Sequence, residues 1–366
     1  MKIHENIRNM RRAHGMTQEE LAAYLGVTAS AVNKWEKGLS YPDITFLPIL
    51  ASYFNISVDE LLGYEPQMTR EDIRKLYQEM AERLSREPFG TVYAECEEYV
   101  RKYHSCFPLV MRMAGLYLNH CQLCEDPQAL MERIISMTDY VIQECREIDI
   151  SKEAQSIQRA CWMLQGHPEK ILESSDEVLH PIDQEMEGIG QAYFMLGNAE
   201  RAQEYLQSAA YQHLLMLIGD TGMLISGQKE YTEQAEQMIR RSLEVAELFH
   251  VEALHFNTMF QLYLAIAEFY VRCAMEEKAL EILERYVSCC VRLKFPIMLH
   301  GDDYFTSIGR FLEELSLGTM APRTDRAIRE SIVSAVCANP AFAPLTGNER
   351  FRRLTEKLKR HLKEEV

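Results

Sequence analysis

Apolar residues recur at the three- and four-residue spacing of helices along almost the whole chain, and no segment alternates like a convincing strand. Capping residues and glycines divide the N-terminal part into five short helices. We expect these helices at residues 7–13, 18–25, 29–37, 46–54 and 58–62. Beyond them, the helical pattern continues nearly to the C-terminus. The pattern therefore predicts an all-α protein.

The ends of the short helices carry residues that satisfy unpaired backbone N–H groups. Residues 17–20 (Thr-Gln-Glu-Glu) and 57–60 (Ser-Val-Asp-Glu) both have the form of a capping box. Thr28 and Thr45 are expected to cap the third and fourth helices. Gly26 ends the second helix and allows a tight turn into the third. Two short helices joined in this way have the geometry of a helix-turn-helix module.

The stretch MTQEELAAYLGVTASAVNKWEKGLSYPDITFLPILASYFNISVDELL, residues 16–62, resembles the Cro/repressor-type (XRE-type) helix-turn-helix family. The resemblance runs without a gap over residues 5–64. It implies a five-helix, lambda-repressor-like DNA-binding domain, which we assign to residues 1–66. The positions that carry the resemblance are Gln18, Leu21, Ala22, Leu25, Gly26, Val27, Val32, Lys34, Trp35, Glu36, Gly38 and Pro42.

The resemblance also implies which residues contact DNA. Gln18 would bind a phosphate or a base edge from the start of the second helix. The third helix would enter the major groove, where Asn33 can pair with adenine and Lys34 with guanine. Lys37 would contact a phosphate in the following turn. The full expected DNA-binding set is Gln18, Thr28, Ala29, Ser30, Asn33, Lys34 and Lys37.

Two positions of this set, and two further residues of the third helix, have distinct expected roles. Thr28 would cap the third helix and reach a backbone phosphate. Ala29 can offer only an apolar contact, for example to a thymine methyl group. Glu36 is acidic on a surface that should be basic, and Arg11 occupies the family position that pairs with it. We therefore expect an internal Arg11–Glu36 ion pair, which leaves Arg8 or Arg12 for phosphate. Trp35 is expected to pack in the core.

The remaining 300 residues, 67–366, follow a short linker at residues 64–68. Within them, residues 188–209 and 264–287 share small and aromatic residues at tetratricopeptide-like offsets, with Gly190 and Tyr193 matching Ala267 and Tyr270. A weaker copy contains Trp162, and a further one would pair Tyr117 with a helix at 129–144. We predict a degenerate tetratricopeptide-like α-solenoid rather than an unrelated helical bundle. The basic C-terminal helix at residues 350–366 is expected to cover its end rather than to contact DNA.

The charge is unevenly distributed. The chain has a formal net charge of −16, yet residues 1–40 carry +2 and residues 67–366 carry −14. This pattern favours double-stranded DNA as a partner of the N-terminal domain alone, residues 1–66, which we call the head. A head of about 65 residues makes too few contacts for useful specificity, so we expect a homodimer formed through the C-terminal domain. If that domain binds an effector, its acidic balance favours a neutral or basic ligand.

Candidate catalytic and metal-binding chemistry is sparse. Cys121 and Cys124 form a CxxC, but no second pair stands at zinc-finger spacing. His250 and His255 lack the spacing and the glutamate of an HExxH motif. Nucleophile-elbow, Walker and GxGxxG motifs do not occur. We therefore expect no enzyme activity, no metal site and no cofactor.

The ten cysteines are scattered through apolar-periodic segments, as Cys96 and Cys161 are. The first 16 residues hold no apolar segment of the signal-peptide type, and no run of 18 uncharged apolar residues occurs. We therefore expect reduced thiols in a cytoplasmic protein that does not contact a membrane.

Taken together, these features predict a sequence-specific DNA-binding transcriptional regulator with a helical effector and dimerisation domain. The layout is similar to that of the cytosolic peptide-sensing regulators of Gram-positive bacteria, which implies a short peptide as effector. Asn119 and Asn257 are the candidate effector-binding residues, because asparagine side chains can clamp a peptide backbone and both lie among apolar-periodic positions. The alternative is a DNA-anchored scaffold whose acidic helical domain binds a protein partner.

Overall fold

The fold is known from a computed structural model, which describes residues 3–64, 67–175, 178–179 and 181–363. The chain divides into two compact units: residues 1–73 with 98–110, and residues 74–97 with 111–366. Glu65 and Pro66 of the expected linker lie outside the described residues. The expected domain boundary at residue 66 stays a prediction.

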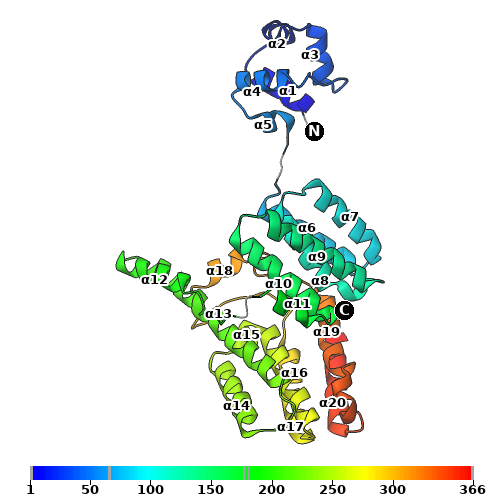
Figure 1. The fold of residues 1–366 in the computed structure, drawn as a ribbon, viewed down its shortest axis with the longest axis vertical. Coiled ribbons are helices and arrows are strands. Elements are labelled where there is room, and N and C mark those ends of the chain that lie inside the picture. Colours follow the sequence, from blue (N-terminus) through cyan, green and yellow to red (C-terminus); the bar gives the residue numbers. More distant parts are fainter. Residues whose placement is uncertain (1–2, 65–66, 176–177, 180, 364–366) are drawn as a thin grey trace. The chain divides into compact units, whose positions relative to one another are not determined.

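The N-terminal helices form a small bundle around one apolar core, in the order that the sequence predicts (Figure 1). Ile7, Leu21, Val32, Leu50 and Leu61, one from each helix, are completely buried in that core. The first helix begins four residues earlier than expected. The five helices are α1 (Ile3–Ala13), α2 (Gln18–Leu25), α3 (Ala29–Glu36), α4 (Phe46–Phe54) and α5 (Val58–Leu62).

Helices joined by loops also form the rest of the described chain, where the one β feature is an isolated bridge between Met298 and Met320. Their bounds are α6 (Arg70–Leu84), α7 (Phe89–Lys102), α8 (Phe107–Asn119), α9 (Pro127–Glu144), α10 (Ile148–Gln165), α11 (Pro168–Glu173), α12 (Glu185–Met195), α13 (Ala199–Ser226), α14 (Glu233–Leu248), α15 (Val251–Leu254), α16 (Phe256–Arg272), α17 (Glu276–Arg292), α18 (Gly309–Glu314), α19 (Asp325–Cys337) and α20 (Glu349–Lys363), with 3₁₀ helices η1 (Cys121–Leu123) and η2 (Pro340–Leu345).

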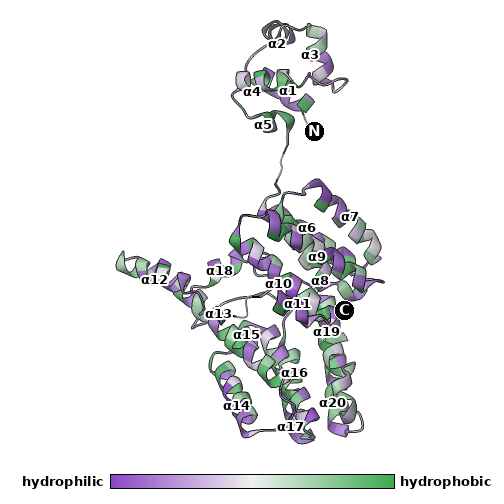
Figure 2. Ribbon diagram, in the orientation of Figure 1, coloured by the Kyte–Doolittle hydropathy of each residue, from purple (hydrophilic) through white to green (hydrophobic). Residues whose placement is uncertain are grey.

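Consecutive helices of the second unit pack as pairs, most extensively α9 with α10, α12 with α13, and α16 with α17. Helix α13 also packs on α16, so α13 shares one core with the α16–α17 pair, and this core continues into α19 and α20. These helices carry both hydrophobic and hydrophilic residues, as amphipathic helices around a core do (Figure 2). The all-helical fold is confirmed, whereas the tetratricopeptide-like solenoid stays a prediction.

Gly190 shows why small residues matter in these pairs. A Cβ atom added at Gly190 would lie 2.6 Å from Leu206 Cγ and 3.4 Å from the carbonyl oxygen of Ala202. Helices α12 and α13 therefore approach each other closely at the position where the sequence pattern requires a small residue. Tyr193 stacks on Tyr205 beside this contact, with ring centroids 5.7 Å apart.

Helix α20 packs on α17 and α19, as expected for a helix that covers the end of the C-terminal core. Phe351, Leu358 and Leu362 are buried on its inner side. Near the start of the helix, Arg350 forms a bidentate ion pair with Glu284 of α17, at 2.6 and 2.7 Å. A basic residue of this helix thus binds an acidic residue of the helix on which it packs. Residues 364–366 of the expected tail lie outside the described residues.

Candidate nucleic-acid interface and effector pocket

Helices α2 and α3 are joined by the tight turn that the sequence predicts. Gly26 has φ of 69°, a left-handed conformation that favours glycine, and its N–H bonds to the end of α2. Thr17 and Glu20 form the expected capping box at the start of α2. At the start of α3, the Oγ1 of Thr28 accepts a hydrogen bond of 3.2 Å from the Ala31 N–H. These local bonds fix both helices of the module.

One prediction about capping is wrong. Thr45 does not cap α4 with its side chain, and its backbone is already helical. Asp43, two residues earlier, accepts instead: its Oδ1 receives hydrogen bonds from the Thr45 N–H at 2.9 Å and from the Thr45 hydroxyl at 2.7 Å. A carboxylate is the stronger acceptor, so the hydroxyl of Thr45 acts as a donor. These bonds keep the pKa of Asp43 below its ordinary value.

One side of α3 is buried and the other is open. Val32, Trp35 and Glu36 are buried, and Trp35 packs in the core as expected. Ser30 and Lys34 are exposed, and Asn33 is half-buried, so these polar side chains lie on the open side of the helix. Lys37 and Thr28, which flank α3, are also exposed. Ala29 is half-buried and contacts the apolar core, which leaves only part of its methyl group accessible.

Glu36 connects the first three helices. Arg11 of α1 binds its carboxylate in a bidentate manner, with Nε–Oε1 of 2.6 Å and Nη2–Oε2 of 3.0 Å. Gln18 of α2 donates a third hydrogen bond, of 2.8 Å, to Oε2. Arg11 also donates to the Met16 carbonyl oxygen at 2.6 Å, so this buried cation has several partners. The expected Arg11–Glu36 ion pair is confirmed.

The electrostatics of this pair follow from its contacts. Burial alone would raise the pKa of Glu36, but the hydrogen bonds from Arg11 and Gln18 keep it below its ordinary value. The pKa of Arg11 is raised by its hydrogen bond to Glu36. Both groups are therefore charged at neutral pH. Arg8 donates to the backbone carbonyl oxygen of Glu36, whereas Arg12 is exposed, so of these two arginines Arg12 remains the better placed for a phosphate.

The comparisons with known proteins agree with this geometry. The helix-turn-helix family HTH_3 matches residues 7–61. The HTH-type transcriptional activator BcrR of Enterococcus faecalis is 34% identical over 83 residues, which cover 21% of this chain and 41% of BcrR. The uncharacterized HTH-type transcriptional regulator YobD of Bacillus subtilis is 31% identical over 75 residues, which cover 19% of this chain and 67% of YobD.

The cryptic phage CTXphi transcriptional repressor RstR of Vibrio cholerae is 36% identical over 63 residues, which cover 17% of this chain and 56% of RstR. No solved structure matches the chain. The fold of α1–α5 and these matches define a DNA-binding regulator with an XRE-type head. The chain belongs to the helix-turn-helix family of transcriptional regulators. The similarity covers only the N-terminal region, and the chain spans less than half the length of BcrR.

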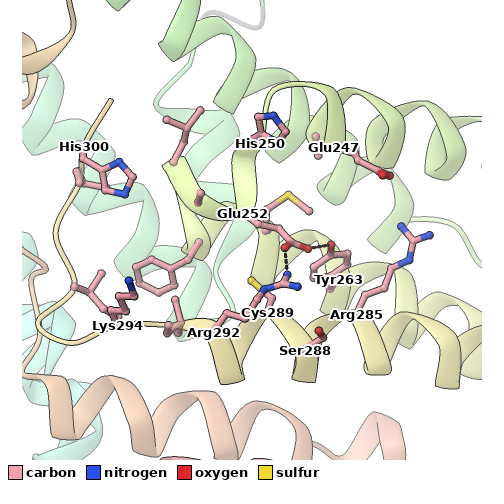
Figure 3. Close-up of a pocket in the computed structure, with 18 of the residues that line it drawn as sticks. Glu247, His250, Glu252, Tyr263, Arg285, Ser288, Cys289, Arg292, Lys294 and His300 are labelled. Carbon is pink, nitrogen blue, oxygen red and sulfur yellow. Dashed lines mark hydrogen bonds and ion pairs between the residues drawn. The ribbon is translucent and has the colours of Figure 1, made fainter. Parts of the chain in front are cut away.

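A cavity of about 980 Å³ opens between α14, α15, α16, α17 and the loop at residues 293–300 (Figure 3). Its floor is apolar, because Leu254, Met259 and Tyr263 are almost completely buried there. Cys289 also lies in this floor, and burial raises the pKa of its thiol to about 12, so it is neutral. Large, mostly apolar cavities with a few polar groups are the usual sites of small ligands.

Charged side chains are distributed along the cavity (Figure 3). Glu252 lies in the middle, where it accepts a hydrogen bond from the Tyr263 hydroxyl and forms an ion pair with Arg292. Lys294 and His300 lie at one end, on the loop. The opposite end holds Glu247 and Arg285. Sequence reasoning missed this cavity, although the break in the helical pattern around Pro296 marks its loop.

The two asparagines expected to bind an effector do not line this cavity. Asn119, on α8, donates a hydrogen bond of 3.2 Å to the Tyr77 hydroxyl, a contact within the protein. Asn257 is exposed and adjacent in sequence to Phe256, which does line the cavity. The structure does not bring the two asparagines into one site with the cavity.

The first three residues of the CxxC segment form the short 3₁₀ helix η1, which Cys124 follows. Cys121 and Cys124 are free and half-buried. In the part of the chain that the structure describes, no group of three or more His, Cys, Asp or Glu side chains is arranged to hold a metal ion. None of the described helices is long and apolar enough to cross a membrane.

Proposed function

We propose that the protein is a sequence-specific DNA-binding transcriptional regulator whose C-terminal helical domain dimerises and binds a peptide or another effector. The single observation that carries the DNA-binding part is the Glu36 contact network. It fixes α2 and α3 to α1 and leaves Ser30, Asn33 and Lys34 on the open side of α3. We place this regulator in the cytoplasm.

The contact network supports a specific role for Gln18. The amide nitrogen of glutamine has two hydrogens, and Glu36 accepts one of them at 2.8 Å. The second is available to a phosphate oxygen or a base acceptor. Glu36 therefore orients Gln18 for DNA rather than withdrawing it, and the acidic residue contributes to binding indirectly.

The other proposed contacts follow from position and chemistry. Asn33 would pair with adenine and Lys34 with guanine, while Ser30 would reach the same groove. Lys37 would bind phosphate, and the partly accessible methyl group of Ala29 would touch a thymine methyl. Thr28 already accepts the N–H of Ala31 at the start of α3, and its hydroxyl hydrogen can still be donated to a phosphate.

Helix α13 supports dimerisation of the C-terminal domain, which we take as residues 67–366 with a tetratricopeptide-like arrangement. Leu214, Ile218 and Ile225 face the core, yet Leu217 and Leu224 on the same helix are each 56% exposed. Met216 and Met223 beside them are also exposed. A helix that is apolar on several sides is normally covered. We propose that a second copy covers it.

A direct test of DNA binding uses the full chain and a labelled pool of random-sequence duplexes. We expect binding that weakens steeply between about 50 and 200 mM salt, because phosphate contacts release counterions. Variant Lys37→Ala should flatten that slope, while Lys170→Ala, an exposed position on α11, should not. Absence of binding at the lowest salt would contradict the proposal, whatever the C-terminal domain binds.

A further inference from the structure

We propose that the cavity between α14, α15, α16, α17 and the 293–300 loop binds a ligand with an apolar body and a carboxylate, with the carboxylate at the Lys294 and His300 end. This inference rests on the proposed effector function and assigns its ligand class. It runs against the expectation from net charge, which favours a neutral or basic ligand.

The charge inside the cavity differs from that of the domain around it. Three Lys and Arg side chains line it, namely Arg285, Arg292 and Lys294, against two glutamates. Glu252 is neutralised by its ion pair with Arg292. Glu247 lies at the far end beside Arg285 (Figure 3). The loop end of the cavity is therefore positive, although residues 67–366 carry a net charge of −14.

Lys294 has no partner among the described residues. Arg292, two residues earlier, is committed to Glu252, whereas Lys294 makes no hydrogen bond or ion pair with a described group and is exposed. The His300 side chain lies at the same end of the cavity (Figure 3). An exposed ammonium group above an apolar floor suits a ligand that is apolar at one end and anionic at the other.

The loop that carries Lys294 is held by contacts within the protein before any ligand binds. The Arg329 guanidinium lies 3.9 Å from the centre of the Phe295 ring. Ile297 is 8% exposed and belongs to the core. The N–H of Leu299 donates a hydrogen bond of 2.8 Å to the Thr319 carbonyl oxygen. These three anchors hold the stretch between Lys294 and His300, so the positive end is preorganised.

The apolar floor supplies the remaining affinity. Leu254, Met259 and the ring of Tyr263 present carbon surface, and the hydroxyl of Tyr263 is occupied by Glu252. The volume of about 980 Å³ lies at the upper end of the range for small-molecule sites. A fatty-acid-like molecule and the free C-terminus of an apolar peptide share the required chemistry. The experiment distinguishes these two sources.

Calorimetric titration of the full chain tests the inference. The small-molecule arm compares octanoate, octan-1-ol and octylammonium. The peptide arm compares an acetylated apolar tetrapeptide with a free carboxylate and the same peptide as its C-terminal amide. We expect at least one carboxylate probe to bind about fivefold more tightly than its uncharged counterpart. The arm in which this occurs identifies the source.

Variants of Lys294 sharpen the test. Lys294→Gln should abolish the preference for the carboxylate, and Lys294→Glu should reverse it in favour of octylammonium. Lys170→Gln, at an exposed position outside the cavity, should preserve it. Equal binding of charged and uncharged probes, a preference unchanged in Lys294→Glu, or no binding of either carboxylate would overturn the inference. DNA binding measured on the same samples distinguishes this failure from failure of the proposed function.

Discussion

Gln18 and Glu36, 18 residues apart in sequence, are joined by a hydrogen bond of 2.8 Å between Nε2 and Oε2. The same oxygen also accepts from Arg11. A residue expected to bind DNA and a residue that DNA should repel are thus parts of one network. This network joins α3 to both α1 and α2.

Removal of the Glu36 charge should destabilise the N-terminal bundle. The side chains of Arg11 and Glu36 are only 10% and 3% exposed, so Glu36→Gln leaves a largely buried arginine without its counter-charge. We expect a loss of about 3 kcal/mol in unfolding free energy. Denaturant unfolding of the full chain, followed for the N-terminal transition, measures it. Glu19→Gln, at an exposed position on α2, should change stability by less than about 0.5 kcal/mol. Unchanged stability together with tighter DNA binding would show that Glu36 is only a surface charge.

Acid should remove the stabilisation that this pair provides. The pKa of Glu36 is lower in the folded state than its ordinary value of about 4.3, so its contribution is complete above that pH and is lost as the pH falls through the folded-state pKa. The stability difference between the wild type and Glu36→Gln should therefore shrink below about pH 4. Melting temperatures of both proteins between about pH 3 and pH 7 measure this dependence. A difference that stays constant would mean that Glu36 keeps its ordinary pKa.

Two glycines on α12 test the close approach of α12 and α13, because only one of them lies at the contact. Gly190→Ala places a Cβ 2.6 Å from Leu206 Cγ, so we expect destabilisation of about 1–3 kcal/mol. Gly188→Ala on the same helix meets nothing within 4 Å and should stabilise by up to about 1 kcal/mol. Thermal unfolding of both variants measures the contrast. The double variant Gly190→Ala, Leu206→Ala should relieve the clash; equal effects of the two glycine substitutions would refute the close contact.

The outer face of α13 should determine the oligomeric state. Leu217→Glu and Leu224→Glu place charges on the face proposed to meet a second copy, and we expect each to convert a dimer into a monomer. Gln203→Glu adds the same charge at another exposed position of α13 and should remain dimeric. Sedimentation velocity at micromolar concentration distinguishes these states. A monomeric wild type, or dimers in all three variants, would exclude this face as the interface.

The features that the sequence predicted correctly depend mostly on residues close together along the chain. The capping boxes and the left-handed Gly26 follow from local chemistry, and the resemblance to a family implied the Arg11–Glu36 pair. The Thr45 prediction failed because Asp43, two residues earlier, is the stronger acceptor. Capping preferences score each position separately, so they do not show which of two nearby residues accepts the hydrogen bond.

The cavity could not be predicted for a different reason. It is assembled from four helices and one irregular loop, with contributing residues that run from Leu243 to His300. The path of that loop is set by contacts with distant residues such as Thr319 and Arg329. The sequence hypothesis selected Asn119 and Asn257 because asparagine side chains can clamp a peptide backbone, and neither residue lines the cavity.

The most direct test of the central claim is selection of bound fragments from a random duplex pool by the full chain, repeated with Asn33→Ala and Lys34→Ala. For the wild type we expect one enriched motif with two half-sites about one helical turn apart. Each variant should lose preference at its own base, at about 1–3 kcal/mol, while Lys170→Ala keeps the motif. An identical motif from the wild type and both α3 variants, or no enrichment by the wild type, would contradict the account.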